Sequence, residues 1–166
     1  MGTTSTKQAI DSLAAAFASL SADSVIRDAS EIDRRYRRNV TALSRAIPMV
    51  LRPKNAQEIV AIVTEANQRD IALYPISTGK NWGMGSKLPV MDGGVVLDLS
   101  RLNHIIEVNE ALRYVVIEPG VTQGQLARYL EEHHPSLTFN LTGTFGETSI
   151  VGNTLERGDG GYARID

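Results

Sequence analysis

The residues of this chain that are best arranged to bind a ligand lie in one glycine-rich loop, residues 75–86. Gly79, Gly83 and Gly85 fall within seven residues, and glycine reaches backbone angles that let main-chain N–H groups approach a ligand closely. Successive N–H groups in such a loop form a concave anion site, to which Lys80 would add positive charge. Hydroxyl groups that could donate further hydrogen bonds belong to Ser77, Thr78 and Ser86. This spacing favours the binding of a diphosphate.

The loop differs from the two best-known phosphate-binding patterns. A nucleoside-triphosphatase loop needs a glycine five positions before Gly79 and a hydroxyl residue after Lys80, but Tyr74 and Asn81 occupy those positions. A dinucleotide fingerprint needs glycine at position 88, where the chain has Leu88. A nicotinamide cofactor is therefore disfavoured. Composition alone leaves one other interpretation open, a glycine-rich surface turn that binds nothing.

The elements that must position this loop indicate a domain of mixed α and β structure. Short apolar runs bounded by turn residues are typical of strands, and a capping residue before an apolar stripe predicts the start of a helix. Asn55 with Glu58, and Thr122 with Gln125, form such starts. We expect strands at 46–51, 71–74, 95–99, 105–108 and 114–118, and helices at 8–20, after 55 and at 123–133. No regular period is expected beyond Pro135.

The first 42 residues are predicted to form a helical N-terminal lead-in at the periphery of the domain. After the helix at 8–20, Ser30 is expected to cap a charged helical turn that ends at Arg38. The four arginines within residues 34–38 are interpreted as the solvated face of this turn, because Glu31 and Asp33 accompany them and no basic-aromatic motif does.

Composition excludes several classes of function. The chain has 17 basic and 19 acidic residues, so no overall field attracts nucleic acid or an anionic membrane, and neither is expected as a partner. Without cysteine it has no disulfide or thiolate metal site. His133 and His134 have no third ligand at a suitable spacing, so no metal is expected. No stretch reaches the roughly 18 apolar residues of a membrane span, and no signal-peptide pattern is present. We therefore expect a cytoplasmic location.

Three segments resemble one known family. Residues 74–85 (Tyr-Pro-Ile-Ser-Thr-Gly-Lys-Asn-Trp-Gly-Met-Gly) resemble the first flavin-binding loop of the vanillyl-alcohol-oxidase / p-cresol-methylhydroxylase family, whose backbone amides hold the diphosphate of FAD. Residues 117–122 (Ile-Glu-Pro-Gly-Val-Thr) look like the family's strand and turn beside the cofactor. Residues 149–158 (Ser-Ile-Val-Gly-Asn-Thr-Leu-Glu-Arg-Gly) are similar to its segment along the flavin ring and ribityl chain. The resemblance covers roughly residues 43–158.

The resemblance implies a set of FAD-binding residues. The first loop would wrap the diphosphate, the Pro119–Gly120 turn would line the groove near the adenine, and the third segment would contact diphosphate, ribityl or ring atoms, with Glu156 close by. A plain strand-ending turn is the alternative for Pro119 and Gly120, and an exposed carboxylate is the alternative for Glu156. The residues assigned to FAD are Ser77, Thr78, Gly79, Lys80, Asn81, Gly83, Gly85, Pro119, Gly120, Ser149, Gly152 and Asn153.

The chain departs from the family pattern at three points. Some relatives bond the flavin covalently to a His that corresponds to about Asn81 here, so binding through this loop should be non-covalent. The run after Gly158 diverges from the family's Gly-Tyr-x-Pro-Tyr-Gly, and we expect a domain truncated at its C-terminal end. Relatives are several times longer, and the substrate domain that supplies their acid-base residues has no counterpart here, so no catalytic residue is assigned.

The resemblance therefore predicts an α+β fold, a p-cresol-methylhydroxylase-type (PCMH-type) FAD-binding domain of two small α/β lobes with FAD between them. The lead-in would span 1–42 and the domain 43–166, with the first lobe at about 43–99 and the second beginning near Leu102.

Two classes of function follow from this assignment. The first is the FAD-binding domain of a flavin-dependent oxidoreductase, an oxidase or dehydrogenase acting on an alcohol, a phenol or a similar small organic substrate. The alternative is a non-catalytic FAD-binding fragment or degenerate paralogue that acts as a binding or interaction module.

Overall fold

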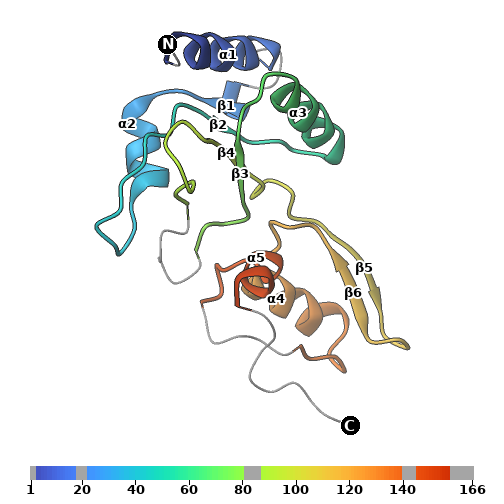
Figure 1. Cartoon of the computed structure of the whole chain (residues 1–166). Helices are drawn as coiled ribbons and strands as arrows, with labels where there is room; N and C mark the ends of the chain where they lie inside the picture. The colour runs from blue at the N-terminus through green and yellow to red at the C-terminus, as the bar shows by residue number, and fades with distance from the viewer. Residues whose placement is uncertain (1–2, 18–21, 81–86, 140–144, 158–166) are drawn as a thin grey trace.

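The computed structural model describes residues 3–17, 22–80, 87–139 and 145–157, which form two lobes (Figure 1). The first lobe holds a four-stranded sheet in the order β1-β2-β4-β3, and the second holds a two-stranded sheet, β5-β6. The strands are β1 (Val25–Ile26), β2 (Val50–Leu51), β3 (Leu73–Ile76), β4 (Val95–Asp98), β5 (Ile105–Asn109) and β6 (Tyr114–Ile117). The predicted α+β class is confirmed, and the sheet order differs from that of a dinucleotide fold.

The sheet of the first lobe is mixed. Strand β1 runs antiparallel to β2, whereas β4 lies between β2 and β3 and is parallel to both. Helix α3 (Ala56–Gln68) connects β2 to β3, and the Asn55 side chain accepts a hydrogen bond from the Glu58 N–H at its start, as predicted. The register pairs Ile76, the last residue of β3, with Asp98, the last residue of β4. These two strand ends therefore lie together where the glycine-rich loop begins.

The side chains on the two faces of the first-lobe sheet pack into two separate hydrophobic cores. Leu51 and Val95 belong to a cluster with residues of α1 (Thr3–Ala16) and α3 on one face. Val50 and Val96 belong to a second cluster on the other face, with Ile32 at the end of α2 (Ala29–Ile32). Successive residues of a strand point to opposite faces, so the continuous apolar runs of β2 and β4 mark strands buried on both sides.

The N-terminal lead-in is helical, but its predicted peripheral position is wrong. Leu13 and Phe17 are 0% and 5% exposed and pack in the core of the first lobe, and β1 extends its sheet. The predicted cap is also wrong, because the side chain of Asp28 rather than Ser30 accepts the hydrogen bond from the Glu31 N–H. Helix α2 continues directly into a π-helical turn, η2 (Asp33–Arg37).

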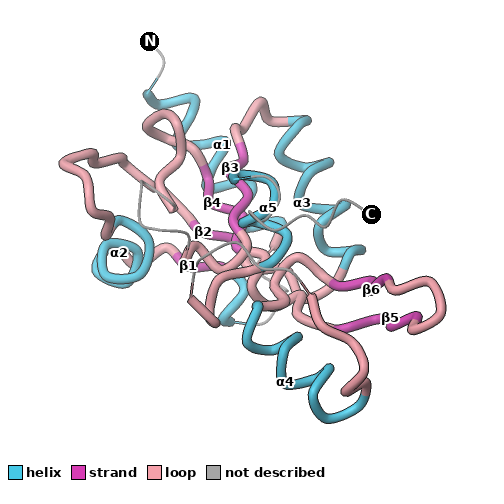
Figure 2. The backbone as a smooth tube through the Cα atoms, turned by 90° about the horizontal axis from the view of Figure 1, so that it is seen from below, coloured by secondary structure: helices cyan, strands magenta, loops and turns pink. Residues whose placement is uncertain are grey.

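The second lobe is built from the β5–β6 hairpin and two helices, α4 (Gln123–His133) and α5 (Ile150–Arg157). The Thr122 side chain accepts a hydrogen bond from the Gln125 N–H, which confirms the predicted start of α4. Leu126 and Leu130 of α4 pack on the inner face of the hairpin, and Figure 2 shows α4 beside these strands. Helix α5 lies where no regular period was expected.

None of the described helices is long and apolar enough to cross a lipid bilayer.

Candidate cofactor site

A pocket of about 190 Å³ lies where the three family-like segments meet. The described residues that line it come from the end of β3 and the first loop, from the 119 turn, and from the start of α5. They are Tyr74, Pro75, Ile76, Ser77, Thr78, Gly79, Lys80, Leu99, Pro119, Thr148, Ser149, Val151, Gly152, Asn153 and Leu155. Segments far apart in the sequence therefore build one pocket.

The sheet positions the first loop and Gly79 shapes it. The Leu99 N–H donates to the Ile76 carbonyl at 2.8 Å, which fixes the point where the chain leaves β3. Gly79 has a φ of +61°, in the left-handed region that favours glycine. A Cβ atom at this position would lie 2.4 Å from Cε of Lys87. The backbone angle therefore favours glycine here, and any side chain would also have to displace that of Lys87.

The start of α5 forms the opposite wall. The Ser149 hydroxyl accepts a hydrogen bond from the Gly152 N–H at 2.9 Å, the pattern of an N-terminal cap. A Cβ atom on Gly152 would lie 2.7 Å from the Ser149 Oγ and 3.1 Å from the Ser77 Oγ. The positive end of the helix dipole thus faces the pocket, where it favours an anion.

Three polar contacts join the two walls beside the pocket. The Ser149 N–H donates to the Thr78 hydroxyl at 3.2 Å, and the Thr148 hydroxyl donates to the Lys80 carbonyl at 3.2 Å. The Lys80 ammonium lies 3.0 Å from the Glu147 carboxylate. The loop of the first lobe is therefore held directly against the second lobe.

The two residues of the Pro119–Gly120 turn have different roles. Pro119 lines the pocket. Gly120 is buried behind it, where its N–H donates to the Leu102 carbonyl at 2.7 Å and an added Cβ would lie 2.6 Å from the same oxygen. Gly120 therefore has a packing role in the turn, and its contact with a cofactor stays a prediction.

The structure gathers most of the predicted site residues. The pocket wall includes Ser77, Thr78, Gly79, Lys80, Pro119, Ser149, Gly152 and Asn153. Asn81, Gly83 and Gly85 lie outside the described residues, as does the side chain of Glu156.

The apolar part of the wall was not predicted. It includes Leu99, Val151 and Leu155. The i, i+4 spacing of Val151 and Leu155 is a signal that could have revealed this face of α5.

A buried acceptor tests whether FAD suits these residues. Asn153 is 3% exposed and lines the pocket, yet its Oδ1 has no hydrogen-bond partner in the part of the chain that the structure describes. Such an atom is costly to bury unless a donor reaches it, and FAD carries donors in its ribityl hydroxyls and ring N–H. The loop, the Lys80 ammonium and the start of α5 suit its diphosphate. The residues present therefore fit this cofactor.

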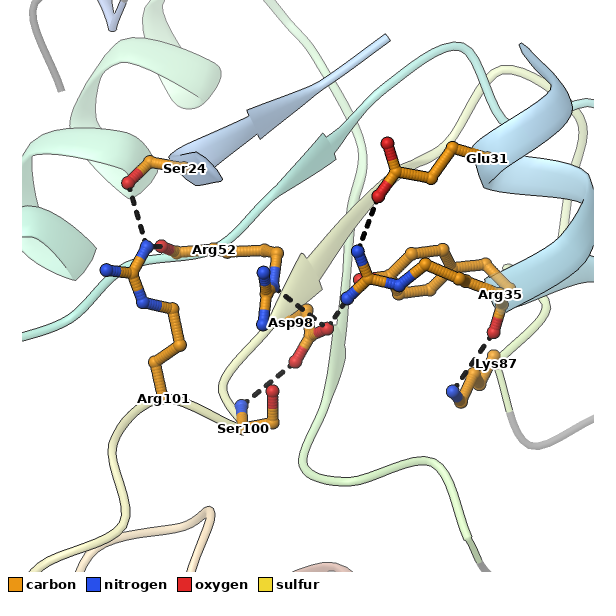
Figure 3. Close-up of polar contacts among 9 residues, drawn as sticks. Ser24, Glu31, Arg35, Arg52, Lys87, Asp98, Ser100 and Arg101 are labelled. Atoms are coloured by element: carbon orange, nitrogen blue, oxygen red, sulfur yellow. Dashed lines mark hydrogen bonds and ion pairs between the residues drawn. The ribbon is translucent and has the colours of Figure 1, made fainter. Parts of the chain in front are cut away.

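A polar cluster surrounds Asp98 at the end of β4, the residue that pairs with Ile76 (Figure 3). The Asp98 carboxylate accepts hydrogen bonds from the Tyr36 hydroxyl at 2.6 Å and the Ser100 N–H at 2.9 Å, and lies 3.6 Å from Nε of Arg52. Burial and the neighbouring carboxylate raise the pKa of Tyr36 above its usual range, so the phenol stays protonated. The Lys87 ammonium donates to the Arg35 carbonyl at 3.0 Å.

The described residues contain no cluster of three or more His, Asp or Glu side chains that could hold a metal ion.

Comparison with known proteins decides the family. Residues 47–165 match the family described as an FAD binding domain. The chain belongs to this FAD-binding domain family. The resemblance to the vanillyl-alcohol-oxidase / p-cresol-methylhydroxylase group is confirmed as well. The chain matches the p-cresol methylhydroxylase structure with substrate bound at a TM-score of 0.83 and 27% identity, over 95% of this chain and 30% of that chain.

Curated relatives include two enzymes with matching domains. The 1'-carboxy-chondrochloren decarboxylase of Chondromyces crocatus is 46% identical over 119 residues, which are 72% of this chain and 22% of the relative. The flavoprotein subunit of 4-cresol dehydrogenase (hydroxylating) from Pseudomonas putida is 36% identical over 104 residues, 63% of this chain and 20% of the relative. This FAD-binding domain thus spans about a fifth of the length of the curated relatives it matches.

Proposed function

We propose that this FAD-binding domain serves a flavin-dependent oxidoreductase that acts on a phenol, an alcohol or a similar small organic substrate. The observation that supports the proposal most strongly is the pocket that three distant segments share. Its wall holds the Asn153 oxygen, which no described residue bonds. The Pseudomonas putida relative is named a 4-cresol dehydrogenase, which favours the phenolic class.

The proposed roles follow the chemistry of each wall. The amides and hydroxyls of residues 77–80 bind the diphosphate, with help from the start of α5. Asn153 accepts a hydrogen bond from a ribityl hydroxyl or the ring N–H, and Leu99 and Val151 exclude water from the cofactor. When bound, FAD would supply the hydride-accepting chemistry, while the protein binds and orients it.

Binding is proposed to be non-covalent, because an amide stands at Asn81, where some relatives carry the His that is bonded to the flavin. Precipitating the FAD-loaded protein with acid should leave the flavin in the supernatant. Yellow colour in the washed precipitate would contradict this proposal.

The second candidate is a non-catalytic FAD-binding module. The described pocket lining favours it in one respect, because its only ionisable side chains are those of Tyr74 and Lys80, and Lys80 is paired with Glu147. Acid-base groups for a substrate would then have to come from outside this pocket. The division into a lead-in at 1–42 and a domain at 43–166 remains a proposal, as does a cytoplasmic location, which the absence of cysteine supports.

One experiment separates these candidates. The purified chain is loaded with FAD, and phenols and phenolic alcohols are added under nitrogen while the flavin absorbance is followed. Bleaching supports an oxidoreductase with its substrate site within this chain. Bound FAD that no substrate bleaches means that this chain has no substrate site of its own, as the binding module requires, and failure to bind FAD at all contradicts both.

A further inference from the structure

Lys87 occupies the space that a side chain on Gly79 would need. Atoms Cε, Cγ and Cδ of Lys87 lie 2.4, 2.5 and 2.9 Å from the position that a Cβ on Gly79 would take. The aliphatic part of Lys87 therefore lies directly against the left-handed turn of the first loop. Gly79 and Lys87 stand on either side of residues 81–86, so this contact joins the two described ends of the glycine-rich segment.

The ammonium of Lys87 lies against the last turn of η2, and Lys87 is not among the residues that line the pocket. It donates to the Arg35 carbonyl at 3.0 Å and lies 5.2 Å from the centre of the Tyr36 ring. Carbonyls in the last turn of a helix lack intrahelical partners, and a cation there also favours the helix dipole. Lys87 thus ties the loop to a helix end that is itself fixed by packing.

Tyr36, which the Lys87 ammonium contacts, also reaches the strand end where the loop begins. Its side chain is 1% exposed, and its hydroxyl donates to Asp98. Asp98 pairs in register with Ile76, after which the loop begins. Burial lowers the pKa of Lys87, which agrees with an ammonium held inside the protein rather than one reaching into solvent.

We propose that Lys87 is a positioning residue for the first loop, whose stem and ammonium hold the Gly79 turn in its anion-binding shape before the cofactor arrives. This inference rests on the proposed function of the loop as the diphosphate site. Lys87 itself does not line the described pocket, so its effect on the cofactor is indirect. Its loss lowers the fraction of molecules whose loop is ready to bind, and the apparent affinity falls by that fraction.

This arrangement has a kinetic signature. A residue that touches FAD would slow dissociation, whereas a residue that prepares an empty loop speeds association and leaves dissociation unchanged. Lys87→Met keeps the stem and removes the ammonium, while Lys87→Ala removes both. Lys54→Met is the matched control, because the Lys54 side chain is 55% exposed and paired only loosely with Glu58, at 3.8 Å.

The experiment is stopped-flow mixing of FAD with the full chain, followed by flavin fluorescence, with circular dichroism to verify folding. We expect association to slow by about threefold in Lys87→Met and about tenfold in Lys87→Ala, with dissociation unchanged, and Lys54→Met to match the parent. Parent-like association in both Lys87 variants overturns the inference, and so does faster dissociation with unchanged association. A parent chain that binds no FAD overturns the proposed function, and this inference with it. If Lys87→Ala does not fold, Lys87→Met decides.

Discussion

The two lobes cover their sheets to different degrees. The strands of the first lobe bury side chains on both faces, in two separate clusters. The hairpin of the second lobe packs the partly buried Ile105 and Val115 against α4, but Ile106 is 63% and Val116 40% exposed on the other face. In the described part of the chain, the first lobe therefore has a two-sided core and the second a one-sided one.

This difference predicts which lobe gains more from a ligand. A one-sided core buries less apolar surface, so the second lobe should open more readily than the first. A cofactor bound between the walls would stabilise whichever lobe opens more easily, because it binds only the closed arrangement. The first lobe then acts as the scaffold, and the second as the part whose order depends on binding.

Replacing a core leucine in each lobe should have the largest effect on stability and should test whether the lobes differ. Leu51 is 0% and Leu126 1% exposed, and a Leu→Ala change at such sites costs about 2–5 kcal/mol. We expect Leu51→Ala to destabilise the whole chain and Leu126→Ala to open mainly the second lobe. Hydrogen exchange checks this: in Leu126→Ala, the amides of α4 should lose protection while those of β4 keep it.

Leu112→Ala is the control for both changes. Leu112 is 72% exposed at the hairpin turn, so its loss should change stability by less than about 0.5 kcal/mol. Equal loss of protection in α4 and β4 after Leu126→Ala would mean that the lobes unfold as one unit.

Gly79→Val should have the next largest effect, on the wall supplied by the first lobe. The φ of +61° strains any side chain, and valine would also collide with the Lys87 stem. We expect FAD affinity to fall by about 100-fold or more, which corresponds to about 2.7 kcal/mol. Fluorescence titration with free FAD measures it.

Gly93→Val is the control that separates the effect of backbone strain from an effect on the pocket itself. Gly93 has a φ of +85° and open space around it, and it does not line the pocket. This variant should lose stability through backbone strain but keep the FAD affinity of the parent. Parent-like binding in Gly79→Val would show that the loop is not the diphosphate site.

Gly152→Ala should act more weakly, on the wall supplied by the second lobe. The added methyl group would press on the hydroxyls of Ser149 and Ser77, which can rotate away, and no left-handed angle is involved. We expect about a tenfold loss of FAD affinity. Thr154→Ala, on the exposed side of the same helix, should leave affinity unchanged. A larger effect than that of Gly79→Val would reverse the ranking of the two walls.

Local signals in the sequence located the starts of α3 and α4 well. Asn55 and Thr122 cap their helices as predicted because each side chain bonds an N–H only three residues away. The apolar run predicts β3 at 71–74, but the strand occupies Leu73–Ile76, because its pairing with β4 extends to Ile76. Pairing with a distant strand is a property of the fold that the apolar run does not contain.

The second wall was harder to predict because its helix depends on distant contacts. Gly152 and Asn153 have low helix propensity, so the sequence around α5 favours a loop. The structure adds the Ser149 cap and a hydrogen bond from the Ile150 N–H to the Val121 carbonyl at 3.1 Å. The hydrogen bond between Lys87 and Arg35 is non-local in the same way, because the two residues are 52 positions apart in the sequence. Resemblance to a family found the site segments, but not the contacts that shape them.

The smallest expected effect lies in the ion pair that links the two walls. Lys80 and Glu147 have side chains that are 54% and 76% exposed, so solvent weakens both their attraction and the attraction of Lys80 for a diphosphate. Lys80→Ala should therefore lower FAD affinity only several-fold, about 1 kcal/mol. Glu147→Gln should raise affinity by about twofold, because it removes a negative charge beside the diphosphate and frees the ammonium of its partner.

The signs of these two changes test whether Lys80 serves the cofactor or only the junction between the lobes. If Lys80 works for the anion, the two substitutions act in opposite directions, and both effects shrink as salt is raised from about 0.05 to 0.5 M. If the pair matters only as a link, both substitutions weaken binding alike, since each breaks the same contact. Titration of the two variants with FAD at both salt concentrations distinguishes these outcomes. If the two variants lose FAD affinity equally, the backbone amides and the dipole of α5, and not Lys80, attract the diphosphate.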